Sequence, residues 1–286
     1  MKKKDLAIVF GITGNWAFAL GNVLIGLKKH NPGLQGDIII YYDSLSLRNR
    51  NALIKIYPVK FIRYKFPANS KQINNINIFT EVSFARYECF SLLKKYKTVA
   101  YFDVDIVMQK NIEELFDYEK NKIAIITNGT KLLKSDFCVD EIEGFNLEVL
   151  EFGSGTIILT DKITNPSEIK DWCYKKISEL ASKVNSPDQA ILNLALQQFN
   201  LEPYKLDETY VFHPNNDGAE NAKILHAYYG KKFWNGTYNA EWEENNKTWL
   251  KLGGDSYNPD WDFANRPIFI RQPYKFVKDF IKRYII

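Results

Sequence analysis

From residue 6 to residue 198, short apolar segments alternate with segments of helical periodicity, and this alternation limits the fold more than any other feature. Strands are expected at residues 6–12, 37–42, 60–66, 98–102, 123–127 and 151–160. Helices are expected at residues 16–29, 45–56, 81–95, 167–183 and 188–198. Ser44 is expected to cap the second helix, and the residues after 200 show no regular pattern. Because parallel strands need a crossover between them, the alternation predicts an α/β fold with a mostly parallel sheet.

Two aspartates, Asp103 and Asp105, follow the apolar segment 98–102, and apolar residues resume directly after them. On an extended chain, residues i and i+2 point to the same side, so the two carboxylates are expected side by side. Like charges at this separation disfavour each other's ionisation, and burial adds a further cost. A hard cation such as Mg²⁺ or Mn²⁺ would relieve both costs and also binds phosphate oxygens. The pattern therefore favours a metal–diphosphate site, with a turn or a helix cap as the alternative.

The basic charge of the chain is concentrated at its carboxyl end. The net charge is +4, and residues 271–286 carry five basic side chains against one acidic side chain. Apolar residues recur there at helical spacing, as in a basic amphipathic helix. Such a helix either lies on an anionic membrane surface or packs against its own domain, and the sequence leaves both open. We expect one domain at residues 1–262, a tail at residues 263–286, and no binding of nucleic acid.

The cysteines and the amino terminus indicate the compartment. Cys89, Cys138 and Cys173 are scattered without the spacing of metal ligands, which fits free thiols in a reducing compartment. Asp5 interrupts the first apolar run, so we interpret that run as a core strand and not as a signal peptide. No segment has the roughly 20 apolar residues that a spanning helix needs. These features predict a cytoplasmic protein, either free or peripheral on the cytoplasmic face of a membrane.

Five segments resemble the family 8 glycosyltransferases, and they occur in the order of that family. YFDVDIV at residues 101–107 resembles the family's strand end YLDADIIV. The other four segments are FARY at 84–87, FGSG at 152–155, SPDQAILN at 186–193, and ILH through Lys232 and Trp234 at 224–234. The resemblance spans residues 15–234. Order and spacing make this set much more specific than any single motif.

The resemblance implies a GT-A type, Rossmann-like nucleotide-sugar-binding fold. It also implies a metal-dependent, retaining transfer of a hexose from a UDP-sugar to a glycan or glycolipid acceptor, such as lipooligosaccharide, capsule or another surface glycan. Asp103, Asp105 and His226 are the expected ligands of Mn²⁺ or Mg²⁺, and His226 follows Ile224 and Leu225 as a strand end would. A non-catalytic nucleotide-sugar- or glycan-binding relative is one alternative. A nucleotidylyltransferase is another, although the loop GITGNW has no basic residue for phosphate.

The same resemblance places residues around the donor. Asp188 and Gln189 are expected to line the donor sugar as the catalytic pair, although Pro187 and Asp188 equally fit the start of a helix. Lys232 is expected to neutralise the diphosphate, and Gly155 and Gly230 to allow close backbone approach to a ligand. The full set of expected donor-binding residues is Thr13, Asn15, Trp16, Arg86, Asp103, Gly153, Ser154, Gly155, Gly230 and Lys232.

The chain also departs from the family in places that bear on specificity. Thr13 stands where the family has an aspartate that helps to hold uracil, so the sequence leaves the nucleobase open. Gly153 stands where the family usually has asparagine. In the histidine segment the glycine comes one place late and Phe233 replaces proline. We therefore expect intact core machinery and altered specificity determinants.

Three aromatic residues near the end of the resemblance could bind an acceptor sugar. Trp234, Tyr238 and Trp242 are expected as stacking platforms, with at least one of them in the core instead.

Overall fold

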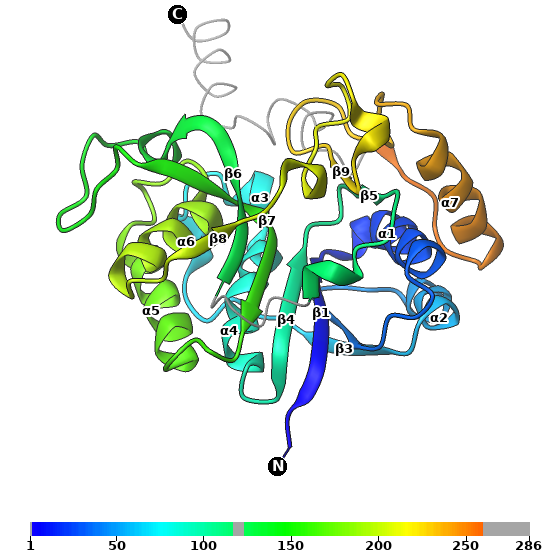
Figure 1. Ribbon diagram of the computed structural model, residues 1–286, viewed down its shortest axis with the longest axis horizontal. Coiled ribbons are helices and arrows are strands. Elements are labelled where there is room, and N and C mark those ends of the chain that lie inside the picture. Colours follow the sequence, from blue (N-terminus) through cyan, green and yellow to red (C-terminus); the bar gives the residue numbers. More distant parts are fainter. Residues whose placement is uncertain (1, 117–122, 260–286) are drawn as a thin grey trace, which may run out of the picture. The chain divides into compact units, whose positions relative to one another are not determined.

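A seven-stranded sheet forms the core of the compact unit that ends at Asp255 (Figure 1). The computed structural model describes residues 2–116 and 123–259. The sheet order is β3-β2-β1-β4-β7-β6-β8, and β7 alone runs antiparallel to its neighbours in this sheet. Its strands are β1 Lys4–Ile12, β2 Asp37–Tyr42, β3 Val59–Arg63, β4 Tyr96–Phe102, β6 Ile123–Leu132, β7 Leu150–Thr160 and β8 Pro203–Lys205. The predicted α/β class with a mostly parallel sheet is confirmed.

Helices cover both faces of this sheet. Figure 1 shows α1, α2 and α7 on one side and α4, α5 and α6 on the other. The helices are α1 Ala17–His30, α2 Leu47–Ile56, α3 Ile76–Phe79, α4 Glu88–Leu92, α5 Pro166–Glu179, α6 Pro187–Gln198 and α7 Ala240–Lys251. Short 3₁₀ turns link them, among them η1 Gly14–Trp16, η3 Glu81–Tyr87, η4 Glu113–Phe116 and η5 Leu133–Asp136. The central strands are continuously apolar because both of their faces are buried.

Most predicted elements are present, with three corrections. Helix α2 begins at Leu47, and its cap is Ser46, whose side chain accepts a hydrogen bond from the Asn49 amide. Ser44 instead accepts a hydrogen bond from the Gly14 amide. The expected helix at residues 81–95 is a 3₁₀ turn followed by the short α4.

The third correction is the region after residue 200, where no regular pattern was expected but strand β8 and helix α7 are present. The apolar stripe of α7 is only two tryptophans, Trp242 and Trp249, and both are buried. Trp249 packs where Gly21 of α1 leaves room, since a Cβ on Gly21 would lie 2.2 Å from the indole ring. Helix α7 therefore completes the core on the α1 side of the sheet.

A second, two-stranded sheet positions the residues that follow β4. It pairs β5, Ile106–Met108, with β9, Ile224–His226, in antiparallel orientation. In this pairing His226 lies opposite Ile106, one residue after Asp105. The predicted strand end at His226 is confirmed.

Several expectations concern features outside this core. The three cysteines are free, with Cys89 and Cys173 buried and Cys138 exposed. Within residues 2–116 and 123–259, no helix has both the length and the hydrophobicity required to cross a bilayer. Residues up to Asp255 belong to one compact unit. The expected boundary at residue 262 and the tail at residues 263–286 lie outside the described residues.

Candidate active site

Three side chains converge where β4 ends. Asp103, Asp105 and His226 each offer a ligand atom, and these atoms all lie within 4.8 Å of one another. His226 Nε2 is 3.0 Å from Asp105 Oδ1 and 3.9 Å from Asp103 Oδ2. The aspartates converge across a bend between β4 and β5, so the expectation that they share one face of an extended strand is wrong in its backbone geometry. Carboxylate oxygens with one imidazole nitrogen are a donor set that suits Mn²⁺ or Mg²⁺.

Gly155 of β7 leaves the space in which these side chains meet. A Cβ at this position would lie 2.4 Å from His226 Cε1 and 2.9 Å from Asp103 Oδ2. The Gly155 carbonyl also accepts a 2.8 Å hydrogen bond from the Asp103 amide. The absence of a side chain here is therefore a condition for the convergence. Gly230 differs, because a Cβ there would meet nothing within 4 Å and glycine is favoured by its φ of +70° instead.

Lys232 lies beside Asp105. Its Nζ is 2.7 Å from Asp105 Oδ2, and it also donates to the Ala227 carbonyl. The Ala227 amide donates in turn to the Asp105 carbonyl, at 3.0 Å. The segment after β9 is thus bonded to both the backbone and the side chain of Asp105.

Arg86 of η3 is the buried cation of the site, with 5% of its surface exposed. Its guanidinium lies 3.0 Å from Asp103 Oδ1 and 2.8 Å from Asp188 Oδ2. It also donates to the Ser154 carbonyl at 2.8 Å and to the Ser83 carbonyl at 2.9 Å. One side chain therefore joins the end of β4, strand β7 and the start of α6.

Burial and neighbouring charges move the pKa values of the two aspartates in opposite directions. Burial raises the pKa of Asp103, Arg86 opposes this effect, and the charge of Asp105 reinforces it. Burial also acts to raise the pKa of Asp105, but His226 and Lys232 lower it below its ordinary value. Asp105 is thus held as a carboxylate, whereas Asp103 would gain from a further cation.

Asp188 and Gln189 occupy the first turn of α6, where Pro187 fits the helix start as expected. Asp188 is 2% exposed, and its Oδ2 is paired with Arg86. Its Oδ1 is buried and has no hydrogen-bond partner among the described residues. Gln189 is half-buried, and its Oε1 accepts a hydrogen bond from the Ser154 amide at 3.1 Å. Both side chains therefore border the region around Ser154.

Strand β7 is fixed to α6 by side-chain amides as well as by packing. Asn193 accepts from the Phe152 amide and donates to the Phe152 carbonyl, both at 2.8 Å. The backbone from Phe152 through Gly153 to Ser154 is thereby held against α6. The residues of α6 that resemble the family therefore have a structural role: the side-chain amides of Gln189 and Asn193 hold β7 against the helix.

The expected donor-binding residues of the first loop, Thr13, Asn15 and Trp16, are not part of the hydrogen-bonded network around Asp103. Asn15 is exposed, Thr13 is half-buried, and Trp16 packs against Trp234 with ring centroids 5.1 Å apart. Phe18 lies against both indoles. The structure therefore brings this loop to the Lys232–Trp234 segment through aromatic contacts. The hydrogen-bonded network itself joins Arg86, Asp103, Asp105, Ser154, Gly155, Asp188, Gln189, His226 and Lys232.

The aromatic residues expected to stack on an acceptor divide between core and surface. Trp242 is 2% exposed and stacks on Phe233, with centroids 5.6 Å apart. Tyr238 is 80% exposed. Trp234 is half-buried in the aromatic contacts described above. Trp242 is therefore a core residue, as expected for at least one of the three.

Sequence reasoning missed Asp136 of η5, which contacts Gln189. Its side chain is fully buried and accepts from Gln189 Nε2, at 3.0 Å to Oδ2 and 3.3 Å to Oδ1. Asp136 lies in the mixed polar stretch KLLKSDFCVD, which gives no sign of burial. Only its packing against the start of α6 reveals the contact.

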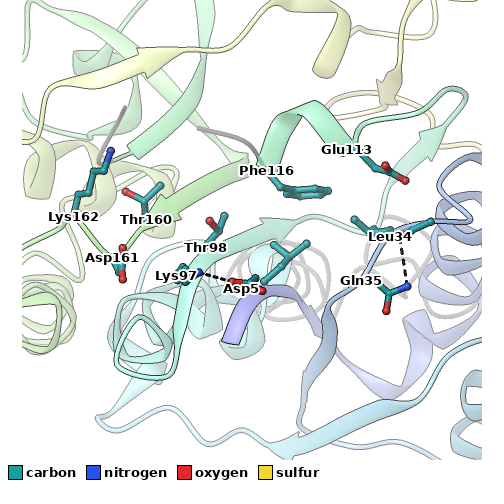
Figure 2. Close-up of a pocket in the computed structure, with 12 residues that line it drawn as sticks. Asp5, Leu34, Gln35, Lys97, Thr98, Glu113, Phe116, Thr160, Asp161 and Lys162 are labelled. Carbon is teal, nitrogen blue, oxygen red and sulfur yellow. Dashed lines mark hydrogen bonds and ion pairs between the residues drawn. The ribbon is translucent and has the colours of Figure 1, made fainter. Parts of the chain in front are cut away.

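A separate cavity lies at the opposite edge of the sheet (Figure 2). Its volume is about 520 Å³, and its lining includes the amino ends of β1 and β4 and the carboxyl end of the antiparallel β7. Its lining includes both acidic and basic side chains, among them Asp5 and Lys97, which form an ion pair. It contains none of the expected site residues.

Comparisons with known proteins identify the family and the fold. The sequence profile "Glycosyl transferase family 8" matches residues 7–237. No curated protein sequence matched the chain. Among solved structures, LgtC, a galactosyltransferase in complex with donor and acceptor sugar analogues, has a TM-score of 0.62 at 14% identity, covering 89% of this chain and 98% of LgtC.

Two further solved structures share the fold over much of this chain. The bifunctional glycosyltransferase WbbM has a TM-score of 0.65 at 16% identity, covering 88% of this chain and 51% of WbbM. The apo-form glycosyltransferase GlyE of Streptococcus pneumoniae TIGR4 has a TM-score of 0.57 at 17% identity, covering 97% of this chain and 64% of GlyE. At these identities the likeness establishes a GT-A fold, as expected, while the profile match establishes the family. The chain belongs to glycosyl transferase family 8 and is a glycosyltransferase.

Proposed function

We propose that this glycosyltransferase moves a hexose from a UDP-sugar to a glycan acceptor, with retention at the anomeric carbon and with the help of a divalent cation. The observation that carries the proposal is the convergence of Asp103, Asp105 and His226 within 4.8 Å. The proposal rests on family membership for the donor class and for retention, and on this geometry for the cation.

The residues present fit Mn²⁺ or Mg²⁺. The donor set has two carboxylates and one imidazole, and Gly155 keeps the space between them free of a side chain. Burial raises the pKa of Asp103 against the opposing effect of Arg86, so its ionised form needs a further positive charge. When bound, the cation would hold diphosphate oxygens and offset the charge that develops on the leaving group.

Lys232 and Arg86 would have different tasks. Lys232 is half-buried, and its ammonium is already at the edge of the carboxylate cluster, where it can turn to a diphosphate oxygen. Arg86 is committed to Asp103, Asp188 and the backbone, so we assign it a positioning role and not direct contact with phosphate. Lys232 therefore carries the neutralisation of the leaving group, together with the cation.

Asp188 and Gln189 would divide the work on the donor sugar. The buried Oδ1 of Asp188 lacks a partner among the described residues, so a sugar hydroxyl can donate to it. The carboxylate charge of Asp188 is already offset by Arg86, at 2.8 Å. Gln189 has an exposed portion and carries its carbonyl oxygen beside Ser154, so we assign Gln189 to face the positive charge that develops on the sugar ring.

The acceptor side of the proposal includes the surface and the tail. Tyr238, which is 80% exposed, offers a stacking surface for an acceptor sugar. We propose that residues 263–286 attach the enzyme to the cytoplasmic face of an anionic membrane, where glycolipid acceptors are found. Removal of the residues from Pro273 onward would then move the protein from anionic liposomes into solution, and an unchanged distribution would overturn the attachment.

The test of the activity is release of a nucleoside diphosphate from a panel of nucleotide sugars, with Mn²⁺ and with a chelator. We expect release from one UDP-sugar that requires the ion and increases with a suitable acceptor. Asp161→Asn, at the opposite edge of the sheet, serves as a matched carboxylate control and should retain activity. Equal release with the ion and with the chelator would contradict the metal assignment, and a preference for a different nucleotide would contradict the donor assignment.

A further inference from the structure

A buried group of charged residues contacts Gln189 and includes none of the expected cation ligands. Asp136 and Glu151 are both fully buried, and Lys131 lies 3.0 Å from Glu151 Oε1 and 3.7 Å from Asp136 Oδ1. Two buried carboxylates with one half-exposed lysine are costly to keep in a fold. The polar partners of each carboxylate therefore matter, because they offset this cost.

Asp136 is bonded to the start of α6 through both its backbone and its side chain. Its carbonyl accepts from the Asn185 amide at 2.7 Å, which fixes the chain just before the helix. Its carboxylate accepts from Gln189 Nε2 through both oxygens and also bonds to the Ser186 side chain. Glu151, by contrast, bonds to Ser135 and Lys131.

The two neighbours of the Gln189 amide determine its orientation. The Ser154 amide can only donate, so it requires the carbonyl oxygen of Gln189 on its side. An ionised Asp136 can only accept, so it requires the NH₂ group of Gln189 on the other side. Both requirements agree. A hydrogen bond to an ionised carboxylate is also about twice as strong as a neutral one.

We propose that Asp136 is a positioning residue that acts through Gln189, holding the carbonyl oxygen of Gln189 toward the donor sugar. This inference rests on the proposed function, in which Gln189 faces the sugar. Asp136 itself does not contact the reacting atoms, so its effect belongs to the transfer step more than to donor binding.

The ionisation of Asp136 makes this positioning dependent on pH. Burial, reinforced by the charge of Glu151, raises the pKa of Asp136 to about 7, while Gln189, Ser186 and Lys131 act to lower it. Above that pH both carboxylate oxygens accept from Gln189. Below it, one oxygen becomes a donor and the bond becomes an ordinary neutral one. Positioning therefore strengthens as the pH rises through about 7.

Kinetics of Asp136 variants test the proposal. In Asp136→Ala we expect kcat to fall about tenfold or more, with KM for the donor changed less than about threefold. In a Gln189→Ala background, Asp136→Ala should lower kcat less than about twofold, because the side chain through which Asp136 acts is already absent. An equal loss in both backgrounds, or no loss in the native background, would overturn the proposal.

Asp136→Asn provides the pH test, since its amide oxygen accepts from Gln189 but never carries a charge. The ratio of native to variant kcat should rise from about 1 near pH 5.5 to severalfold near pH 8.5. The matched control is Glu151→Gln, whose kcat near pH 8.5 should equal the native value. In this variant the increase of kcat that accompanies ionisation of Asp136 should occur at lower pH, because the charge of Glu151 no longer raises the pKa of Asp136. A ratio that does not change with pH would contradict the proposal.

The outcomes also separate this inference from the proposed function. If Gln189→Ala lowers the rate of transfer while Asp136→Ala leaves kcat unchanged, only the positioning role fails. If Gln189→Ala retains full activity, the role of Gln189 in the proposed function fails first.

Discussion

A single aspartate at one edge of the sheet and a pair of aspartates at the opposite edge show how differently this fold surrounds half-buried carboxylates. At the amino end of β2, Asp37 accepts bonds from Lys4, Lys60 and Tyr96, at 2.8 Å from Lys4 and 2.5 Å from Tyr96. At the carboxyl end of β4, the two carboxylates of Asp103 and Asp105 share two cations, Arg86 and Lys232, and His226 adds a charge only when it is protonated.

The difference appears in the direction of the pKa shifts. Burial acts to raise the pKa of Asp37, but Lys4, Lys60 and Tyr96 together lower it below its ordinary value. Burial raises the pKa of Asp103, and the charge of Asp105 adds to the effect, despite Arg86. Neighbouring cations offset the negative charge of Asp37, whereas the cations around Asp103 and Asp105 do not offset both of their negative charges. An excess of negative charge of this kind is typical of a position that binds a cationic ligand.

The largest effect on activity is expected from substitutions of Asp103 and Asp105. Asp103→Asn and Asp105→Asn should each lower the rate of metal-dependent nucleotide release by about 10³-fold, because each removes a charged oxygen ligand. The circular dichroism spectrum should remain native. Retention of near-native activity by either variant would mean that the cation is held elsewhere.

Gly155→Ala should have the next largest effect, because it leaves every charge in place and fills the space between them. The added methyl group would meet His226 Cε1 at 2.4 Å, so the imidazole or the strand must move. We expect affinity for Mn²⁺ to fall about 10–100-fold. Gly230→Ala is the comparison, since its Cβ would meet nothing and only its backbone conformation is strained. Equal affinities in the two variants would contradict the argument from space.

A smaller effect is expected from Lys232→Gln, which distinguishes stabilisation of the leaving group from binding of the cation. We expect the rate of nucleotide release to fall about tenfold, because a charge near the diphosphate is lost. Affinity for Mn²⁺ should not fall, since Lys232 competes with the ion for the Asp105 carboxylate. Isothermal titration with Mn²⁺ would check this, and weaker binding of the ion would show that Lys232 instead supports the site.

The smallest effect on activity is expected from a substitution of Asp37. Asp37→Asn should leave nucleotide release within about twofold of native while lowering the free energy of unfolding at pH 7 by about 1–2 kcal/mol. The ordinary pKa of aspartate is about 3.9 and that of Asp37 is lower in the fold, so this stability is present above about pH 4 and lost as the pH falls. Thermal unfolding of both proteins at pH 7 and pH 3 would check the difference, and an equal gap at both values would refute the assignment to charge.

The sequence predicted six of the seven strands of the sheet because each of the six has a local signal, whereas the three-residue β8 was missed. Strands such as Asp37–Tyr42 are runs of apolar residues with clear ends, and α1 and α6 are mostly apolar segments too long for strands. Helix α7 was missed because two tryptophans give only a weak stripe. Ser44 and Ser46 are equally good caps by local chemistry, and only the tertiary bond from Gly14 distinguishes them.

The site was predictable to a different degree. The metal ligands could be proposed because charged residues inside an apolar segment are conspicuous, and His226 through the resemblance. Their convergence over a bend, and the space left by Gly155, depend on β7 and β9 lying beside β4 and β5. Asp136 could not be found from sequence, since its contact with Gln189 joins residues 53 positions apart.

The most direct test of the account is the number of Mn²⁺ ions bound per chain, measured by electron paramagnetic resonance in the presence of UDP. We expect a single tightly bound ion in the native protein, and loss of that ion in Asp103→Asn and Asp105→Asn but not in Asp37→Asn. Binding of the same ion by all four proteins, or none by the native protein, would contradict the assignment of Asp103, Asp105 and His226 as its ligands.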